Sequence, residues 1–189
     1  SSVFNKEKRG YEGKTITEIS KTLNKPPLEF VLDLLYEEDC KVSVIFFNMS
    51  EENLARILKW DSVMIGSDSS LRSLKGVLNY GKPHPRGYGT FSRVIRKYVN
   101  ETALLSIEEA IYKMTGFPAQ TLGLKDRGIL KEGYFADITI FDQETIAEQA
   151  TFASPHNYST GIKHVLVNGK LTINAGKHKS ITNGVILKK

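Results

Sequence analysis

Two short apolar runs, separated by one amphipathic stretch, constrain what this chain can fold into more than any other feature. The first run is Lys41-Val42-Ser43-Val44-Ile45-Phe46-Phe47 and the second is Val63-Met64-Ile65-Gly66. Both are short for helices of such hydrophobicity, and the first is rich in β-forming residues. Between them, Ser50 is placed to cap a helix whose first turn holds Glu51 and Glu52. A strand, a helix and a second strand, with continuous apolar strands, predict a parallel sheet covered by helices.

An acid directly follows the second run. Gly66-Ser67-Asp68 places a carboxylate at the carboxyl end of the predicted strand, and an arginine follows in Pro83-His84-Pro85-Arg86. In barrels of parallel strands, the carboxyl ends of the strands carry the chemistry. An aspartate after a strand is more often a turn former or a helix cap. Asp68 is therefore a candidate catalytic residue with a structural alternative.

Capping signals predict where several helices start. Thr15 with Glu18, and Ser106 with Glu109, each form a capping box ahead of an apolar stripe. In such a box each side chain binds the backbone N–H of the other residue, which satisfies donors that the first turn leaves unpaired. The pair Pro26-Pro27 predicts a further helix start, because proline is tolerated in the first helical turn.

One more helix is expected after Thr90. Its apolar residues recur at helical spacing and form one broad stripe, which we assign to the core: Phe91, Val94, Ile95, Tyr98 and Val99. Gly116 and then Pro118 are expected to end the helix that starts at Ser106.

After about residue 122 the pattern changes to short strands and turns. Residues 136–142 alternate as a strand with one solvated face. Asn168-Gly169 separates two β-forming runs, 164–167 and 170–173, and predicts a hairpin with a type I′ turn. Residues 143–161 have no clear period and are expected to form a long surface loop. We therefore expect one domain over residues 1–122 and a small β domain over residues 123–189.

Composition narrows the class of protein. The chain has 189 residues, of which 40% are hydrophobic and 25% charged, as in ordinary globular proteins. It contains no apolar run long enough to span a membrane, and its start does not resemble a signal peptide. The net charge of +5 is spread along the chain, so we expect neither a nucleic acid nor a membrane as partner. The single cysteine, Cys40, fits a cytoplasmic location and is expected to be a buried structural thiol.

Three motifs carry a resemblance to a known family: Ile65-Gly66-Ser67-Asp68, Pro83-His84-Pro85-Arg86-Gly87-Tyr88-Gly89-Thr90-Phe91 and Met114-Thr115-Gly116-Phe117-Pro118-Ala119-Gln120. With them, the chain resembles the C-terminal part of the D-aminoacylases, or N-acyl-D-amino-acid deacylases, of the amidohydrolase superfamily. The narrow part of the resemblance is the Ser-Asp acid followed by Pro-His-Pro-Arg and Gly-Thr-Phe. Residues 128–137 and 165–170 are similar to the small β domain that many amidohydrolases share.

The resemblance implies a fold of the α/β plus β class. Residues 1–122 would supply the last strands and helices of a metal-dependent (β/α)8 barrel, and residues 123–189 the C-terminal share of a small β-sandwich. A complete barrel takes about 200 to 250 residues, so the chain is expected to be a fragment. Removing most of a barrel exposes strand edges and apolar faces, so the fragment is also expected to self-associate.

The resemblance also implies an activity and roles for three residues. The complete enzyme would hydrolyse the amide of an N-acyl-D-amino acid to a carboxylate and a free D-amino acid. Asp68 would be the catalytic general base and acid, Arg86 would bind the substrate α-carboxylate, and His84 would contribute to the substrate pocket. The structural alternative for Arg86 is a salt bridge to a helix end.

The implied cofactor is zinc, and the family's ligands do not match residues of this chain. No two of its histidines, His84, His156, His164 and His178, have the short spacing of a local metal site. We therefore expect the metal ligands to lie outside this chain and the isolated chain to be inactive. Two alternatives stay open, namely another amidohydrolase, such as a dihydroorotase-like or isoaspartyl-dipeptidase-like enzyme, and a folded remnant without catalysis.

Overall fold

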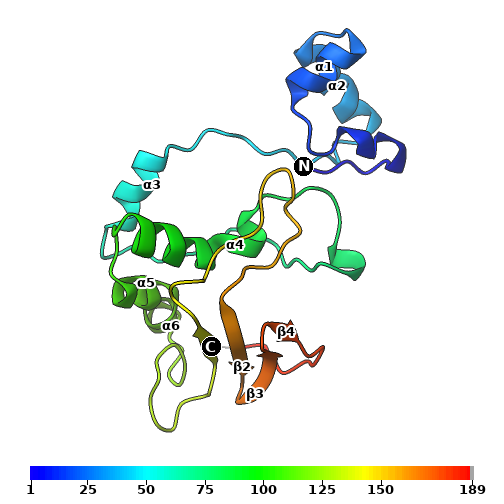
Figure 1. The fold of residues 1–189 in the computed structure, drawn as a ribbon. Coiled ribbons are helices and arrows are strands. Elements are labelled where there is room, and N and C mark those ends of the chain that lie inside the picture. Colours follow the sequence, from blue (N-terminus) through cyan, green and yellow to red (C-terminus); the bar gives the residue numbers. More distant parts are fainter. Residues whose placement is uncertain (188–189) are drawn as a thin grey trace. The chain divides into compact units, whose positions relative to one another are not determined.

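The structure is a computed structural model that describes residues 1–187, and residues 188–189, the end of the expected β domain, lie outside the described residues (Figure 1). The chain forms two compact units. The first unit consists of Ser1–Asn48, Ser69–Tyr88 and Ala150–Asn157, and the second of Met49–Asp68, Gly89–Gln149 and residues 158–187. Within residues 1–187, no helix is long and apolar enough to cross a membrane.

Helices dominate the first unit. They are η1 (Lys6–Tyr11), α1 (Ile16–Leu23), α2 (Pro27–Glu37) and η2 (Gly76–Leu78), and the unit also holds the first residues of α4 (Arg86–Arg93). The capping box predicted for α1 is confirmed, since Thr15 Oγ1 accepts the N–H of Glu18 at 3.1 Å and Glu18 Oε2 accepts the N–H of Thr15 at 2.6 Å. Helices α1 and α2 lie side by side (Figure 1). The ring of Tyr11 packs edge-on against the buried Phe30, with centroids 5.6 Å apart.

The strand predicted over residues 41–47 is wrong. Ser43 forms one isolated bridge with Ser2, and the rest of the segment makes no ladder with any described residue. Phe46 and Phe47 are each 75% exposed. A parallel strand is stabilised by neighbours that satisfy its backbone and cover both faces, and this segment has neither. Cys40 also departs from expectation: it is exposed, because it lies with φ +58° in the turn that follows α2.

The second unit contains α3 (Glu51–Leu58), the rest of α4, a π-helix η3 (Val94–Glu101), α5 (Ile107–Met114) and α6 (Gly116–Leu122). These helices enclose a small core whose buried members are Leu58, Val94, Tyr98, Leu105 and Ala110. The predicted caps are present, since Ser50 accepts the N–H of Asn53 and Ser106 forms a capping box with Glu109. The core therefore draws on the apolar stripes that helical periodicity predicted.

Two helix boundaries and one strand differ from what the sequence predicted. Helix α4 begins at Arg86, ahead of Thr90, and continues into the π-helix η3. Gly116 and Pro118 do end α5, but they also open α6, because proline in a first helical turn removes no intrahelical hydrogen bond. The strand predicted over residues 63–66 is absent: Ile65 donates its N–H to Lys113 O at 3.1 Å, and no ladder forms within the described chain.

One antiparallel sheet completes the second unit. Its strands run in the order β1 (Ile138–Phe141), β2 (Ile162–Val167), β3 (Lys170–Asn174) and β4 (Lys177–His178). The hairpin predicted at Asn168-Gly169 is confirmed, with Val167 paired to Lys170 and φ values of +50° and +75° in the turn. The second unit thus combines helices with one small antiparallel sheet.

Residues 143–161 connect β1 to β2 as a long loop that is anchored at several points. Ala147 and Thr160 form an isolated bridge, and Ile146 and Ala150 are buried. The expected loop is therefore present, although parts of it contribute to the packed interior.

Candidate active site

Asp68 ends the segment that leaves α3. Its backbone is left-handed, with φ +46°, a conformation that aspartate tolerates better than most residues. Its side chain is exposed. An exposed carboxylate can accept a proton from a small molecule. Its position then depends on how firmly the preceding residues, 60–65, are held.

Lys113 holds that segment from α5. The residue is only 5% exposed, and its Nζ donates to Trp60 O at 2.5 Å and to Val63 O at 3.1 Å. With the Ile65 N–H bond to Lys113 O, one residue makes three contacts to residues 60–65. A buried ammonium group is costly unless hydrogen bonds compensate it. These bonds therefore fix the course of residues 60–65, which lead to Asp68. The sequence did not indicate this role, because a lysine in the last turn of a helix is common.

His84 and Arg86 lie in the turn that starts α4. His84 Nδ1 accepts the backbone N–H of Arg86 at 3.0 Å, and the next two N–H groups bond to His84 O and Pro85 O. A helix start leaves its first N–H groups without intrahelical partners, and the imidazole satisfies one of them. His84 thus acts as a side-chain cap of α4, and the cap sets the orientation of its ring.

Arg86 is the first residue of α4 and is exposed. A guanidinium group offers two parallel donors that match a carboxylate, and the adjacent helix start favours negative charge. The turn is closely packed behind it, since a Cβ on Gly87 would lie 2.7 Å from Ser69 Oγ. The arrangement suits recognition of a carboxylate by the Arg86 side chain.

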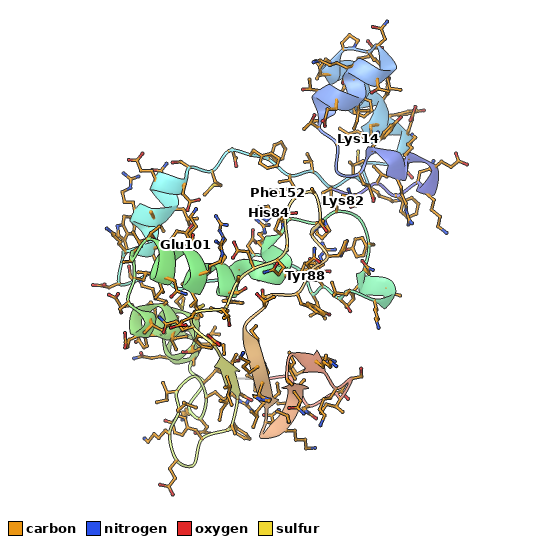
Figure 2. The ribbon with its side chains drawn as sticks, viewed as in Figure 1. Lys14, Lys82, His84, Tyr88, Glu101 and Phe152 are labelled. Carbon is orange, nitrogen blue, oxygen red and sulfur yellow. The ribbon has the colours of Figure 1, made fainter. Side chains whose placement is uncertain are left out.

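Three further residues lie at this turn, and the sequence did not identify them: Tyr88, Phe152 and His156. The Tyr88 hydroxyl lies 2.9 Å from Ser73 O and 3.0 Å from His156 Nδ1, within hydrogen-bond distance of both. The ring of Phe152 meets His84 nearly edge-on, with centroids 4.9 Å apart (Figure 2). These contacts join residues 68 positions apart in the chain, so no local spacing could reveal them.

In the second unit, Glu148 binds two arginines, Arg93 at the end of α4 and Arg96 in η3. Arg96 donates to it from Nε at 2.7 Å and Arg93 from NH1 at 3.1 Å. Burial raises the pKa of Glu148, but the hydrogen bonds from Arg96 and Arg93, the positive charge of Arg96 and a backbone hydrogen bond together outweigh it and hold the pKa of this carboxyl below its usual range. Gly89 makes room for Glu148, because a Cβ there would lie 2.6 Å from Glu148 Cβ. This cluster anchors the long 143–161 loop on α4 and η3.

The structure brings together some of the residues predicted for the site. His84 and Arg86 share one turn of the first unit, joined by a hydrogen bond. Asp68 belongs to the second unit and is described there by its own contacts. The role of each of the three residues stays a prediction.

Comparison with known proteins identifies the family. Residues 61–173 match the model of the amidohydrolase family. The chain belongs to the amidohydrolase family. The matched range contains Asp68, His84 and Arg86, and it ends in strand β3.

Individual amidohydrolases extend this finding. The chain is 44% identical over 130 residues to an N-acyl-D-glutamate deacylase of Alcaligenes xylosoxydans xylosoxydans, covering 69% of this chain and 25% of that protein. It is 38% identical over 157 residues to a D-aminoacylase of the same organism, covering 83% and 30%. A solved structure from work on the binuclear metal centre of D-aminoacylase is 34% identical, with a TM-score of 0.80 over 92% of this chain and 34% of that one. The chain thus spans a quarter to a third of the length of these proteins.

The described part of this amidohydrolase does not supply a metal centre. Within residues 1–187, no three His, Cys, Asp or Glu side chains are grouped so that they could hold a metal ion. Three or four such ligands are the usual minimum for zinc. The residues present therefore do not fit the metal that the family resemblance implies.

Proposed function

We propose that this chain is the C-terminal part of an amidohydrolase that hydrolyses the amide of N-acyl-D-amino acids, giving a carboxylate and a free D-amino acid. The observation that carries the proposal is the 44% identity to an N-acyl-D-glutamate deacylase, over a stretch of 130 residues. The similarity to D-aminoacylase supports the same reaction class.

Asp68 is the proposed general base and acid. Its carboxylate would accept the proton of the attacking water and return it to the leaving nitrogen, which then departs as the amine of the D-amino acid. The exposure of Asp68 supports this role, as do the Lys113 contacts that hold residues 60–65 before it.

Arg86 is the proposed ligand of the substrate α-carboxylate. Its exposed guanidinium at the first residue of α4 supports the role, because a planar fork of donors fixes the orientation of a carboxylate as well as its charge. His84 would border the same pocket, and its hydrogen bond to the Arg86 N–H ties the two residues together.

A (β/α)8 barrel with a small β-sandwich is the proposed architecture of the complete protein. Residues 1–122 would belong to the barrel and residues 123–189 to the sandwich. Residues 41–47 and 63–66 would pair with strands that this chain does not contain. Zinc stays a prediction of the resemblance, because the described residues do not supply its ligands.

The exposed apolar side chains support the proposed self-association. Val77 is 91% exposed, and Phe46 and Phe47 are 75% exposed. We expect light scattering to show a species heavier than the 189-residue monomer. A compact monomer at every concentration would contradict this expectation.

The experiment that tests the function compares this chain with the complete protein. Each is incubated with N-acetyl-D-methionine and with its L-isomer, and release of methionine is measured together with zinc content. The proposal expects release from the D-isomer by the complete protein only. If that protein instead hydrolyses dihydroorotate or an isoaspartyl dipeptide, the alternative amidohydrolase is correct. If neither preparation hydrolyses any of these substrates, the chain is better described as a folded remnant.

A further inference from the structure

The segment Ala150–Asn157 contacts the start of α4 at two points. At one point the ring of Phe152 meets His84 with centroids 4.9 Å apart, and Phe152 also packs on Phe47 at 4.9 Å. At the other, His156 meets Tyr88 ring to ring at 5.7 Å and through the hydroxyl at 3.0 Å. Figure 2 shows His84, Tyr88 and Phe152 in the same part of the first unit. The two contacts lie on either side of Arg86 in the sequence.

His156 links three backbone segments of the first unit. Its Nε2 lies 2.8 Å from Gly81 O, and because a carbonyl can only accept, Nε2 must donate. Its Nδ1 lies 3.0 Å from the Tyr88 hydroxyl, whose single proton can be donated either to Nδ1 or to Ser73 O, 2.9 Å away. The loop before α4, the first turn of α4 and the 150–157 segment are therefore joined through one imidazole.

The contacts of Phe152 and His156 hold the backbone on both sides of Arg86. His84, two residues before it, is held by Phe152 and bonds to the Arg86 N–H. Tyr88, two residues after it, is held by Ser73 and His156. The backbone at Gly87 lies close to the preceding segment, since a Cβ there would lie 2.7 Å from Ser69 Oγ and 3.3 Å from Arg72 Cγ. An exposed guanidinium can be aimed only as accurately as its backbone is fixed.

We propose that His156, acting through Tyr88, is a positioning residue that holds the first turn of α4 and so aims Arg86 at the substrate carboxylate. The inference rests on the proposed function for the role of Arg86. The structural hold on the turn does not depend on it.

Two variants separate the two hydrogen bonds of the ring. In His156→Gln the side-chain amide can reach the place of Nε2 and keep the bond to Gly81 O, whereas in His156→Asn it reaches the place of Nδ1 and keeps the contact to Tyr88. Tyr88→Phe removes the hydroxyl and keeps the ring. His178→Ala is the control, because His178 lies exposed at the edge of the sheet in the second unit.

The complete protein is assayed with N-acetyl-D-methionine and with its uncharged amide, N-acetyl-D-methioninamide. We expect His156→Ala and Tyr88→Phe to raise KM for the carboxylate substrate about tenfold, the scale of losing partly buried hydrogen bonds, with kcat changed much less. KM for the amide should stay near the wild-type value, and His156→Asn should recover more binding than His156→Ala. Equal losses on both substrates, or an unchanged KM in His156→Ala and Tyr88→Phe alike, would overturn the inference.

Hydrogen–deuterium exchange of the same proteins provides a readout that needs no substrate. The backbone amides of Arg86, Gly87 and Tyr88 should exchange faster in His156→Ala and Tyr88→Phe than in the wild type or His178→Ala. Unchanged exchange refutes the inference even if the enzyme is a deacylase. Faster exchange in a protein that releases no D-methionine would instead refute the proposed function and keep the structural hold.

Discussion

Replacing Gly161 with alanine should destabilise the second unit much more than the same change at Gly169. Both glycines have left-handed backbone, with φ +80° and +75°. A Cβ on Gly161 would lie 2.4 Å from Ile146 Cα and 2.5 Å from Ile146 N, whereas a Cβ on Gly169 meets nothing within 4 Å. Comparing the two alanine variants therefore separates the free-energy cost of the left-handed backbone from the cost of steric overlap between the new Cβ and Ile146.

The magnitude follows from these two terms. An L-residue in the left-handed region costs about 1 to 2 kcal/mol, and the loss of glycine freedom in the unfolded chain returns about 0.4 to 1 kcal/mol of it. Gly169→Ala should thus lower the free energy of unfolding by about 1 kcal/mol. Gly161→Ala adds an overlap with backbone atoms, which cannot rotate away, at about 1 to 3 kcal/mol more.

The steric overlap at position 161 would displace the buried residue Ile146. This residue is 4% exposed, and its N–H bonds to Asp142 O, while the Asp142 N–H bonds to Gly161 O, both at 2.9 Å. Urea unfolding followed by circular dichroism should place the midpoint of Gly161→Ala clearly below that of Gly169→Ala. Equal midpoints for the two variants would show that the packing argument is wrong.

Three further changes test the site and the core. Asp68→Asn in the complete protein should lower kcat about 10²- to 10⁴-fold, the usual contribution of a general base, and near-normal turnover in steady-state assays would exclude that role. Arg86→Lys should raise KM for N-acetyl-D-methionine with a smaller effect on kcat, because the two parallel donors are lost, and an unchanged KM would count against carboxylate binding. Tyr98→Phe removes a hydrogen bond of 2.5 Å to the half-exposed Glu51 and should cost about 1 kcal/mol at neutral pH. Burial, together with that bond, raises the pKa of Tyr98 to about 12 from 10, so its contribution to stability is complete below pH 10 and is lost as the pH rises through 12; alkaline unfolding of the phenylalanine variant should lack this loss.

Features encoded by neighbouring residues could be predicted from the sequence. The capping boxes at Thr15 and Ser106 and the Asn168-Gly169 turn all form as expected, because each depends on groups a few positions apart. The start of α2 at Pro27 is another such local feature.

Features that depend on distant partners could not be predicted in this way. Residues 41–47 have β-forming composition, but a strand also needs neighbours on both sides, and composition does not supply them. The contact of Tyr88 with His156 and the bonds from Lys113 to Trp60 and Val63 join positions 50 to 68 residues apart. The conversion of α4 into a π-helix at Val94 has no sequence signal that we can identify.

The turn between β2 and β3 has a consequence for engineering the chain. Hairpin turns are normally good sites for inserted sequence, but here the Asn168 side chain binds Arg127 and Asn183 O, its N–H binds Asp137, and the Gly169 N–H binds Ala136 O. A peptide tag placed between residues 168 and 169 would disturb the hydrogen bonds that tie Arg127, Asp137 and Asn183 to this turn. The exposed Gly133, with nothing within 4 Å of its Cβ position, is a safer place for a label.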